Sequence, residues 1–182
     1  MSHEQGVAAA FRPRKIGIEI GGFSPGLSFI LPIMPLAPQE LRTYFTTFTT
    51  AGRRRRFTVT TNAALMVSTL ETYRVQGKFA LHAFVVMPDH VHVLLTPAHD
   101  VSLEKALQFI KGGFSFRLKS PSEIWERGHF DKRVPDRAAY EACLVYIDQN
   151  PVKERLSTVP SDYPFCSAHG AVELDPMPPC FQ

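Results

Sequence analysis

The sequence predicts an α+β fold of the ferredoxin-like type, in which a β-α-β-β-α-β split βαβ sandwich builds an antiparallel sheet with helices on one face. Two observations predict it. Strand-like and helix-like segments follow one another in that order, with one further helix at the end. In addition, 182 residues of 45% hydrophobic content suit one core better than two domains. Helices on one face would leave the other face of the sheet free for a site or a partner.

The first strand and the first helix are expected within residues 42–76. Residues 42–50 are rich in threonine and aromatic side chains, which favours a strand, and Gly52 interrupts that pattern. Residues 63–76 carry apolar side chains at helical spacing. Thr61 and Asn62 are plausible capping residues for this helix, and Gly77 marks its end.

A hairpin and a second helix follow. Residues 80–87 and 90–96 predict two strands, and Pro88 and Asp89 between them favour a tight turn. Ser102 is the expected N-cap of the second helix. The apolar stripe of that helix comprises Leu103, Leu107, Ile110, Phe114 and Leu118.

The last part of the domain is less regular. Residues 124–134 predict a fourth strand or an irregular edge, and Asp136 is the expected N-cap of a third helix that Pro151 stops at Asn150. We therefore expect a disordered extension at 1–40, a folded domain at 41–170 and an irregular tail at 171–182. Because recognisable patterning begins only after Met34, one hypothesis is that Met34 is the true start.

Composition limits which partners and which cellular compartment suit the protein. The net charge of +3 is only mildly basic, so a nucleic-acid partner must be argued from where lysine and arginine cluster. The three cysteines show no pairing pattern, which argues against disulfides and thiolate zinc sites and favours a reducing cytoplasm. Prolines and glycines interrupt the apolar residues 16–37, so we expect neither a signal peptide nor a membrane span.

Two histidines stand at the start of the third predicted strand. Because side chains alternate along a strand, His90 and His92 point to one face while Val91 points to the other. Two imidazoles on one face can bind one metal ion. The alternative is that they are ordinary strand histidines that bond to neighbours or water.

A tyrosine stands out on the third helix. Tyr140, Leu144 and Ile147 form the face expected to pack on the sheet, whereas Tyr146 shares another side with Ala139, Cys143 and Asn150. The small neighbours leave room for something to approach. The alternative is a half-buried surface tyrosine, with Asn150 a plain helix-end residue.

In four segments the chain resembles the single-tyrosine HUH transposases of small bacterial insertion sequences, most closely their REP-associated tyrosine transposase branch. The resemblance spans roughly residues 41–170, and residues 163–168 echo the closing segment of that family. The four segments are Val86-Met87-Pro88-Asp89-His90-Val91-His92, Phe109-Ile110-Lys111-Gly112, Ile124-Trp125-Glu126-Arg127-Gly128-His129-Phe130-Asp131 and Tyr146-Ile147-Asp148-Gln149-Asn150-Pro151-Val152.

The resemblance implies a metal-dependent single-stranded DNA endonuclease and strand transferase, a transposase that acts through a 5′-phosphotyrosine intermediate. It implies that His90 and His92 bind Mg²⁺ or Mn²⁺ and that Tyr146 is the nucleophile. Asn150 stands where related transposases have a glutamine and is carried over as a third metal ligand. The implied partner is single-stranded DNA or a DNA hairpin formed by a repeat sequence. The protein would be a monomer or a homodimer.

DNA-binding residues have weaker support in the sequence. The run Arg53, Arg54, Arg55 and Arg56 could contact phosphates, or it could be a solvated turn. Lys111 and Lys119 recur along one face of the second helix with the same two interpretations, and Trp125 could stack on an unpaired base or belong to the core.

Two rival functions stay open at this point. One is a domesticated protein that binds DNA hairpins without cleaving them. The other is a hydrolase in which the histidine pair holds a metal ion that activates water, so that Tyr146 would be incidental.

Overall fold

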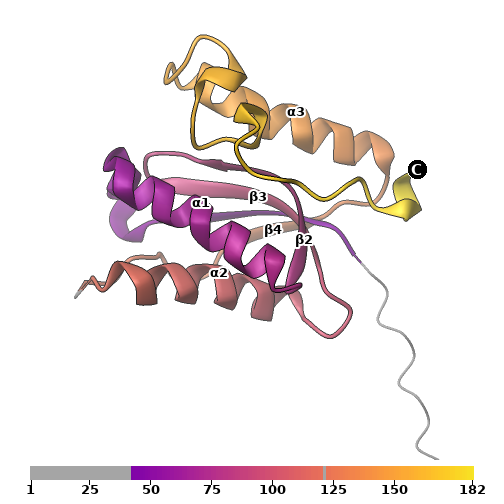
Figure 1. Cartoon of the computed structure of the whole chain (residues 1–182), viewed down its shortest axis with the longest axis horizontal. Coiled ribbons are helices and arrows are strands. Elements are labelled where there is room, and N and C mark those ends of the chain that lie inside the picture. The colour runs from indigo at the N-terminus through magenta and orange to yellow at the C-terminus, as the bar shows by residue number, and fades with distance from the viewer. Residues whose placement is uncertain (1–41, 121) are drawn as a thin grey trace, which may run out of the picture. The chain divides into compact units, whose positions relative to one another are not determined.

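The computed structural model describes residues 42–120 and 122–182, and it has the predicted α+β ferredoxin-like architecture (Figure 1). The four strands form one antiparallel sheet in the order β2-β3-β1-β4. The strands are β1 (Tyr44–Thr49), β2 (Phe79–Val86), β3 (His90–Pro97) and β4 (Phe130–Arg133), and the α-helices are α1 (Thr60–Val75), α2 (Leu103–Leu118) and α3 (Arg137–Lys153). The expectations for residues 1–40 and for Met34 lie outside the described residues.

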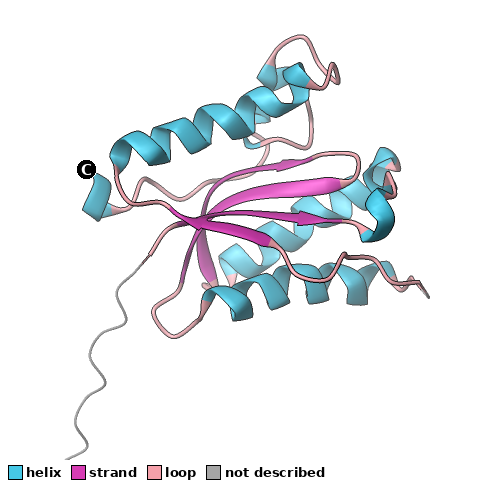
Figure 2. Cartoon of the chain, turned by 180° about the vertical axis from the view of Figure 1, so that it is seen from behind, coloured by secondary structure: helices cyan, strands magenta, loops and turns pink. Residues whose placement is uncertain are grey.

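Helices α1 and α2 pack side by side on one face of the sheet (Figure 2). Val91, Val93 and Leu95 of β3 point into this layer and are fully buried, as strand alternation predicts. The stripe on α2 contributes Leu107, Ile110 and Phe114 to the same core. Burial of these apolar side chains holds the two helices against the sheet.

The other face of the sheet is not free, so the expectation that it stays open for a site or a partner is wrong. Helix α3 lies across that face, mainly over β2 and β3 (Figure 1). Tyr140 and Ile147 of α3 are buried in a second apolar cluster with Val85 and Leu94. Strands β2 and β3 are therefore covered on both faces, which explains why their sequences are nearly continuous apolar runs.

The expected caps of two helices are confirmed, and that of α1 is wrong. The Ser102 hydroxyl and the Asp136 carboxylate accept the Lys105 and Ala139 N–H groups at the starts of α2 and α3. Helix α1 begins at Thr60 without a side-chain cap. Asn62 donates instead to the carbonyl of Arg56, which lies in the preceding turn.

Two predicted boundaries also shift. Pro151 does not stop α3 at Asn150, because the carbonyls of Asn150 and Pro151 still accept the N–H groups of Glu154 and Leu156. Strand β4 covers four residues of the predicted 124–134, and Trp125 forms an isolated bridge with Thr50. Between Trp125 and Phe130 the chain leaves the sheet, and the fourth strand is therefore short.

The chain after α3 returns along β2. Val86 donates its N–H to the carbonyl of Phe165, and Leu81 exchanges hydrogen bonds with Asp175. The Asp175 carboxylate also pairs with Arg74, at 2.9 Å from its Nε. The segment 171–182 thus lacks regular strands and α-helices but lies against the sheet and α1.

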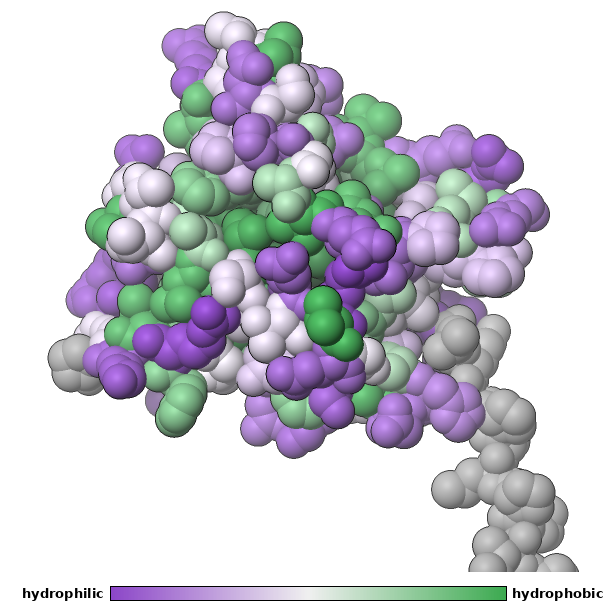
Figure 3. Space-filling model, viewed as in Figure 1, coloured by the Kyte–Doolittle hydropathy of each residue, from purple (hydrophilic) through white to green (hydrophobic). Residues whose placement is uncertain are grey.

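Apolar side chains on the face drawn in Figure 3 gather toward the middle, and hydrophilic ones border them.

Within the part of the chain that the structure describes, no helix is long and apolar enough to cross a membrane.

Candidate active site between β3 and α3

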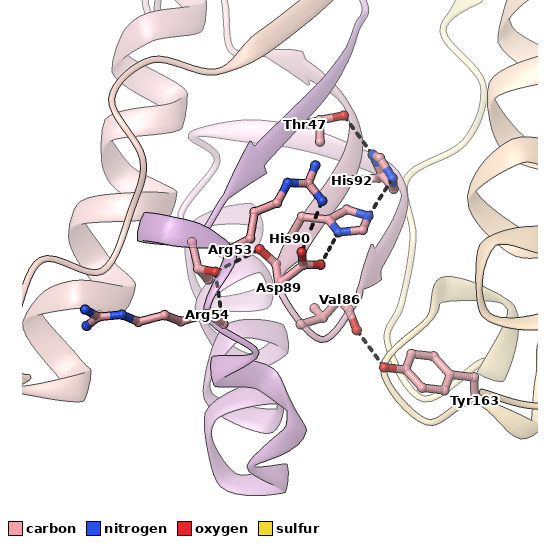
Figure 4. Close-up of polar contacts among 9 residues, drawn as sticks. Thr47, Arg53, Arg54, Val86, Asp89, His90, His92 and Tyr163 are labelled. Atoms are coloured by element: carbon pink, nitrogen blue, oxygen red, sulfur yellow. Dashed lines mark hydrogen bonds and ion pairs between the residues drawn. The ribbon is translucent and has the colours of Figure 1, made fainter. Parts of the chain in front are cut away.

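His90 and His92 project from the start of β3 toward the face that carries α3. Their Nε2 atoms lie 3.1 Å apart (Figure 4). This is the same-face arrangement that strand alternation predicts. His92 is only 5% exposed, whereas His90 is partly open to solvent.

Each histidine is held through its other ring nitrogen (Figure 4). His90 Nδ1 lies 2.6 Å from Asp89 Oδ1, and His92 Nδ1 lies 2.7 Å from the hydroxyl of Thr47. A carboxylate only accepts hydrogen bonds, so His90 donates its Nδ1–H and presents the lone pair of Nε2. Asp89 is itself tied to Arg53, at 3.2 Å. These contacts orient both rings so that their Nε2 atoms converge.

The electrostatics of the pair keep His92 neutral. Burial, followed by the charge of neighbouring His90, lowers the pKa of His92 to about 3. The neutral imidazole is the form that binds metal ions. His92 is therefore in its neutral form at physiological pH.

Tyr146 lies next to this pair, on the side of α3 that faces β1 and β3. Its ring centroid is 5.2 Å from that of His92 and 5.6 Å from that of Phe45, and both contacts are edge-to-face. The Nζ of Lys153 lies 5.1 Å from the centre of the Tyr146 ring. Tyr146 is 41% exposed, so a substrate can reach it. The structure thus brings His90, His92 and Tyr146 together.

Asn150 has a local role in the structure. Its side-chain Nδ2 donates to the carbonyl of Tyr146 at 2.9 Å, and the residue is only 7% exposed. This bond stabilises the helix just before Pro151. Among the described residues, no group of three or more histidine, cysteine or acidic side chains could hold a metal ion. Two imidazoles are thus the ligands that the geometry favours, and a ligand role for Asn150 stays a prediction.

The arginine run does not act as one patch. Arg53 and Arg55 line a cleft of about 440 Å³ beside His90, together with Asp89 and Glu154. Arg54 points away from the histidines (Figure 4). Arg56 donates to the side chain of Ser122 and the carbonyl of Glu123. Of the four arginines in the run, Arg53 and Arg55 are the two that line the cleft beside His90.

Trp125 is a core residue, so the expectation that it stacks on DNA bases is wrong. It is 8% exposed and packs against Phe48, Phe57 and Phe114. Its indole N–H donates to the carbonyl of Lys111 and to the hydroxyl of Ser115. A ring buried and bonded in this way offers no free face to a base.

The two lysines predicted to bind DNA, Lys111 in α2 and Lys119 at its C-cap, differ from each other. The Nζ of Lys111 donates to the carbonyls of Glu126 and Gly128, and burial lowers its pKa. Lys111 thus contacts the segment before β4, and its DNA-binding role stays a prediction. Lys119 is exposed at the end of α2, where its positive φ of 51° closes the helix. It lies in the layer of α1 and α2, on the face of the sheet opposite the histidines.

Sequence reasoning missed four residues of the site: Thr47, Phe45, Asp89 and Lys153. The antiparallel register of β1 and β3, which sets Thr47 opposite His92, would have identified Thr47. In the sequence pattern Asp89 is only a turn residue. Lys153 follows Tyr146 by about two helical turns and so shares its side of α3.

A ferredoxin-like sheet with His-x-His on a central strand and a tyrosine on the helix above it defines the single-tyrosine HUH class. Within that class, residues 40–150 match the family described as "Transposase IS200 like". The chain belongs to this family of transposases.

Curated relatives carry the REP-associated name. The chain is 27% identical to a putative REP-associated tyrosine transposase of Haemophilus influenzae, over 55% of this chain and 65% of that relative. It is also 27% identical to the REP-associated tyrosine transposase of Escherichia coli, over 70% of this chain and 76% of the other. The chain thus spans slightly less than two thirds of the Haemophilus relative.

A solved structure shares the fold. It shows a REP-associated tyrosine transposase bound to a REP hairpin, and it superposes with a TM-score of 0.63 at 23% identity. The match covers 80% of this chain and 90% of that one.

Proposed function

We propose that the protein cleaves and rejoins unpaired DNA beside a hairpin-forming repeat, with Tyr146 as nucleophile and a divalent metal ion at His90 and His92. The observation that carries the proposal is the convergence of the two imidazole Nε2 atoms beside an exposed tyrosine ring. A histidine pair alone is compatible with hydrolysis by water. The adjacent tyrosine favours covalent chemistry.

His90 and His92 could supply part of the ligand set of a metal ion. Two neutral imidazoles, each oriented by an oxygen atom behind it, are typical of metal-binding histidines. When bound, Mg²⁺ or Mn²⁺ would act as a Lewis acid toward a phosphate oxygen. Phosphate and water would supply the remaining ligands.

The proposed step is a transesterification. The phenolic oxygen of Tyr146 attacks the phosphorus, the bond from phosphorus to the 3′ oxygen breaks, and a 5′-phosphotyrosine forms. The phenol gives up its proton and the departing 3′ oxygen takes one up. Because the phosphodiester energy is kept in the tyrosine ester, a DNA 3′-hydroxyl can reverse the step and join strands without a nucleotide cofactor.

The surroundings of the site suit a DNA phosphate. Arg53 and Arg55 line the cleft next to His90, and Lys153 lies over the Tyr146 ring. These cations would offset the charge of the backbone. The REP hairpin in the related complex, and the names of the two curated relatives, support a hairpin as the structured part of the substrate.

The three cysteines are unpaired thiols, which supports the expected cytoplasmic location. A monomer or a homodimer would both present this site.

The test uses labelled single-stranded DNA that carries a hairpin, incubated with the protein and Mg²⁺ or Mn²⁺. We expect a protein–DNA adduct that survives denaturant and disappears with chelator or in Tyr146→Phe. Tyr140→Phe is the matched control, because Tyr140 lies on the same helix but is buried against the sheet. That variant should keep the adduct.

The outcomes separate the rival functions. Hairpin binding without an adduct would identify a domesticated DNA-binding protein. Cleavage that persists in Tyr146→Phe would identify water as the nucleophile and a metal-dependent hydrolase.

A further inference from the structure

An apolar pocket opens directly beside Tyr146, between β4 and α3. It has a volume of about 260 Å³, and neither the histidine pair nor the arginine cleft includes it. Its residues are Phe45, Phe130, Lys132, Arg133, Val134, Ala139, Ala142, Cys143 and Tyr146. Small side chains of α3 leave the space open, and aromatic rings form its walls.

Two of these aromatic rings are exposed. Phe130 is 58% exposed and Tyr146 is 41% exposed, and between them Phe45 contacts both, with ring centroids at 6.5 Å and 5.6 Å. Exposing a phenylalanine on a short edge strand leaves apolar area in water that burial would stabilise. A flat apolar ligand between these rings would cover that area.

The pocket adjoins the site where the phosphate is proposed to lie. The Phe45 ring stacks on His92 at 5.4 Å on one side and meets Phe130 on the other. Lys132 lines the pocket, and Lys153 lies over the Tyr146 ring. The surroundings therefore combine an apolar, aromatic interior with cations at the edge next to the histidines.

We propose that this pocket receives one unpaired nucleobase of the DNA, from a nucleoside that flanks the phosphodiester attacked by Tyr146. The assignment rests on the proposed function. A base has a flat π-face for Phe130 and Phe45, and its sugar-phosphate would run past the lysines toward His92. Such a base must leave the stack, so the pocket selects unpaired DNA at the cleavage point.

Chemical protection of Cys143 tests the proposal. Cys143 lines the pocket and is half-buried, whereas Cys166 is buried. Burial raises the pKa of both thiols, and that of Cys166 reaches about 11. In a Cys180→Ser background, iodoacetamide should therefore modify Cys143 selectively. Its rate is measured without DNA, with hairpin DNA carrying a single-stranded flank, and with the same DNA made abasic at either nucleoside flanking the cleaved bond.

We expect bound DNA to slow the modification of Cys143 at least about fivefold, and an abasic site at one of the two flanking positions to restore the rate. Protection that persists with both abasic DNAs, or no protection by bound DNA, would overturn the pocket. The adduct assay, run on the same samples, keeps the two proposals apart. An adduct without protection rejects the base pocket alone, whereas failure to bind DNA and form an adduct rejects both.

A matched pair of variants gives a second measurement. Phe130→Ala should weaken binding of the single-stranded flank at least about fivefold. Phe116→Ala removes an aromatic ring that is 81% exposed on α2, away from the pocket, and should leave binding unchanged. Equal affinities of the two variants would contradict the proposal.

Discussion

The rings of His92 and Tyr146 meet edge to face, with their centroids 5.2 Å apart and their planes at 74°. One ring comes from a central strand and the other from the helix that covers it. The site therefore exists only while α3 is packed on the sheet, and variants that loosen this packing should lose activity together with stability.

Asp89→Ala should weaken metal binding. The carboxylate holds the Nδ1–H of His90 at 2.6 Å, and removal of such a partner of a metal-binding histidine lowers metal affinity about 10- to 100-fold. Titration calorimetry with Mn²⁺ measures the change directly. Asp89→Asn keeps an oxygen that can accept the His90 N–H, so its metal affinity should fall less than that of Asp89→Ala. Equal affinities for wild type and Asp89→Ala would show that His90 needs no orienting partner.

Arg55→Ala should weaken DNA binding more than Arg54→Ala does. Both changes remove one positive charge, but only Arg55 lines the cleft beside His90. The plot of log affinity against log salt for single-stranded DNA should become shallower by about 0.7 for each phosphate that the variant no longer neutralises. Fluorescence anisotropy at several salt concentrations gives this slope. If the two variants have the same slope, net charge rather than position controls binding.

Acid should destabilise the metal-free protein. Burial lowers the pKa of His92 from 6.5 to about 3, so below pH 6.5 the unfolded chain binds a proton that the folded chain does not. Stability is thus present above pH 6.5 and is lost as the pH falls toward 3. From these two pKa values, His92 alone should remove about 2 kcal/mol between pH 7 and pH 5.

Urea denaturation in the presence of chelator, at pH 7 and pH 5, measures this loss. His92→Gln should lose less stability than wild type over the same interval. His82 adds to the effect, because burial lowers its pKa as well. An acid response unchanged by His92→Gln would assign the loss to other groups.

Two adjacent glycines of α2 should respond oppositely to alanine. A Cβ on Gly113 would come within 2.7 Å of the Tyr73 hydroxyl and would meet the edge of its ring, which is stacked on Phe109. Gly113→Ala should therefore destabilise the protein by about 1–3 kcal/mol. A Cβ on Gly112 meets nothing within 4 Å, so Gly112→Ala should stabilise it by up to about 1 kcal/mol. Thermal unfolding of both variants measures these changes in stability. A melting temperature that shifts in the same direction in both variants would contradict the close approach of α1 and α2.

Local signals in the sequence predicted much of the fold. The alternation along β3 correctly placed His90 and His92 on one face, and Ser102 and Asp136 cap their helices as expected. These features depend on residues within a few positions of one another. The capping prediction for α1 was wrong because Asn62 found a competing acceptor, the carbonyl of Arg56.

Features set by long-range packing could not be predicted in this way. Trp125 is buried because Phe48, Phe57 and Phe114 converge on it from three other elements. The contact of Thr47 with His92 depends on the pairing register of β1 and β3. The pocket beside Tyr146 depends on how far α3 lies from β4, which no local pattern encodes.

The segment that returns along β2 also bears on assembly. Its backbone already occupies hydrogen-bonding groups of β2 at Leu81 and Val86, while the opposite outer strand, β4, is only four residues long and carries Asp131, Lys132 and Arg133. A homodimer that joined two sheets through β2 would first have to displace this segment, and one joined through β4 could pair along only four residues. We therefore expect any homodimer of this chain to associate through its helices or loops.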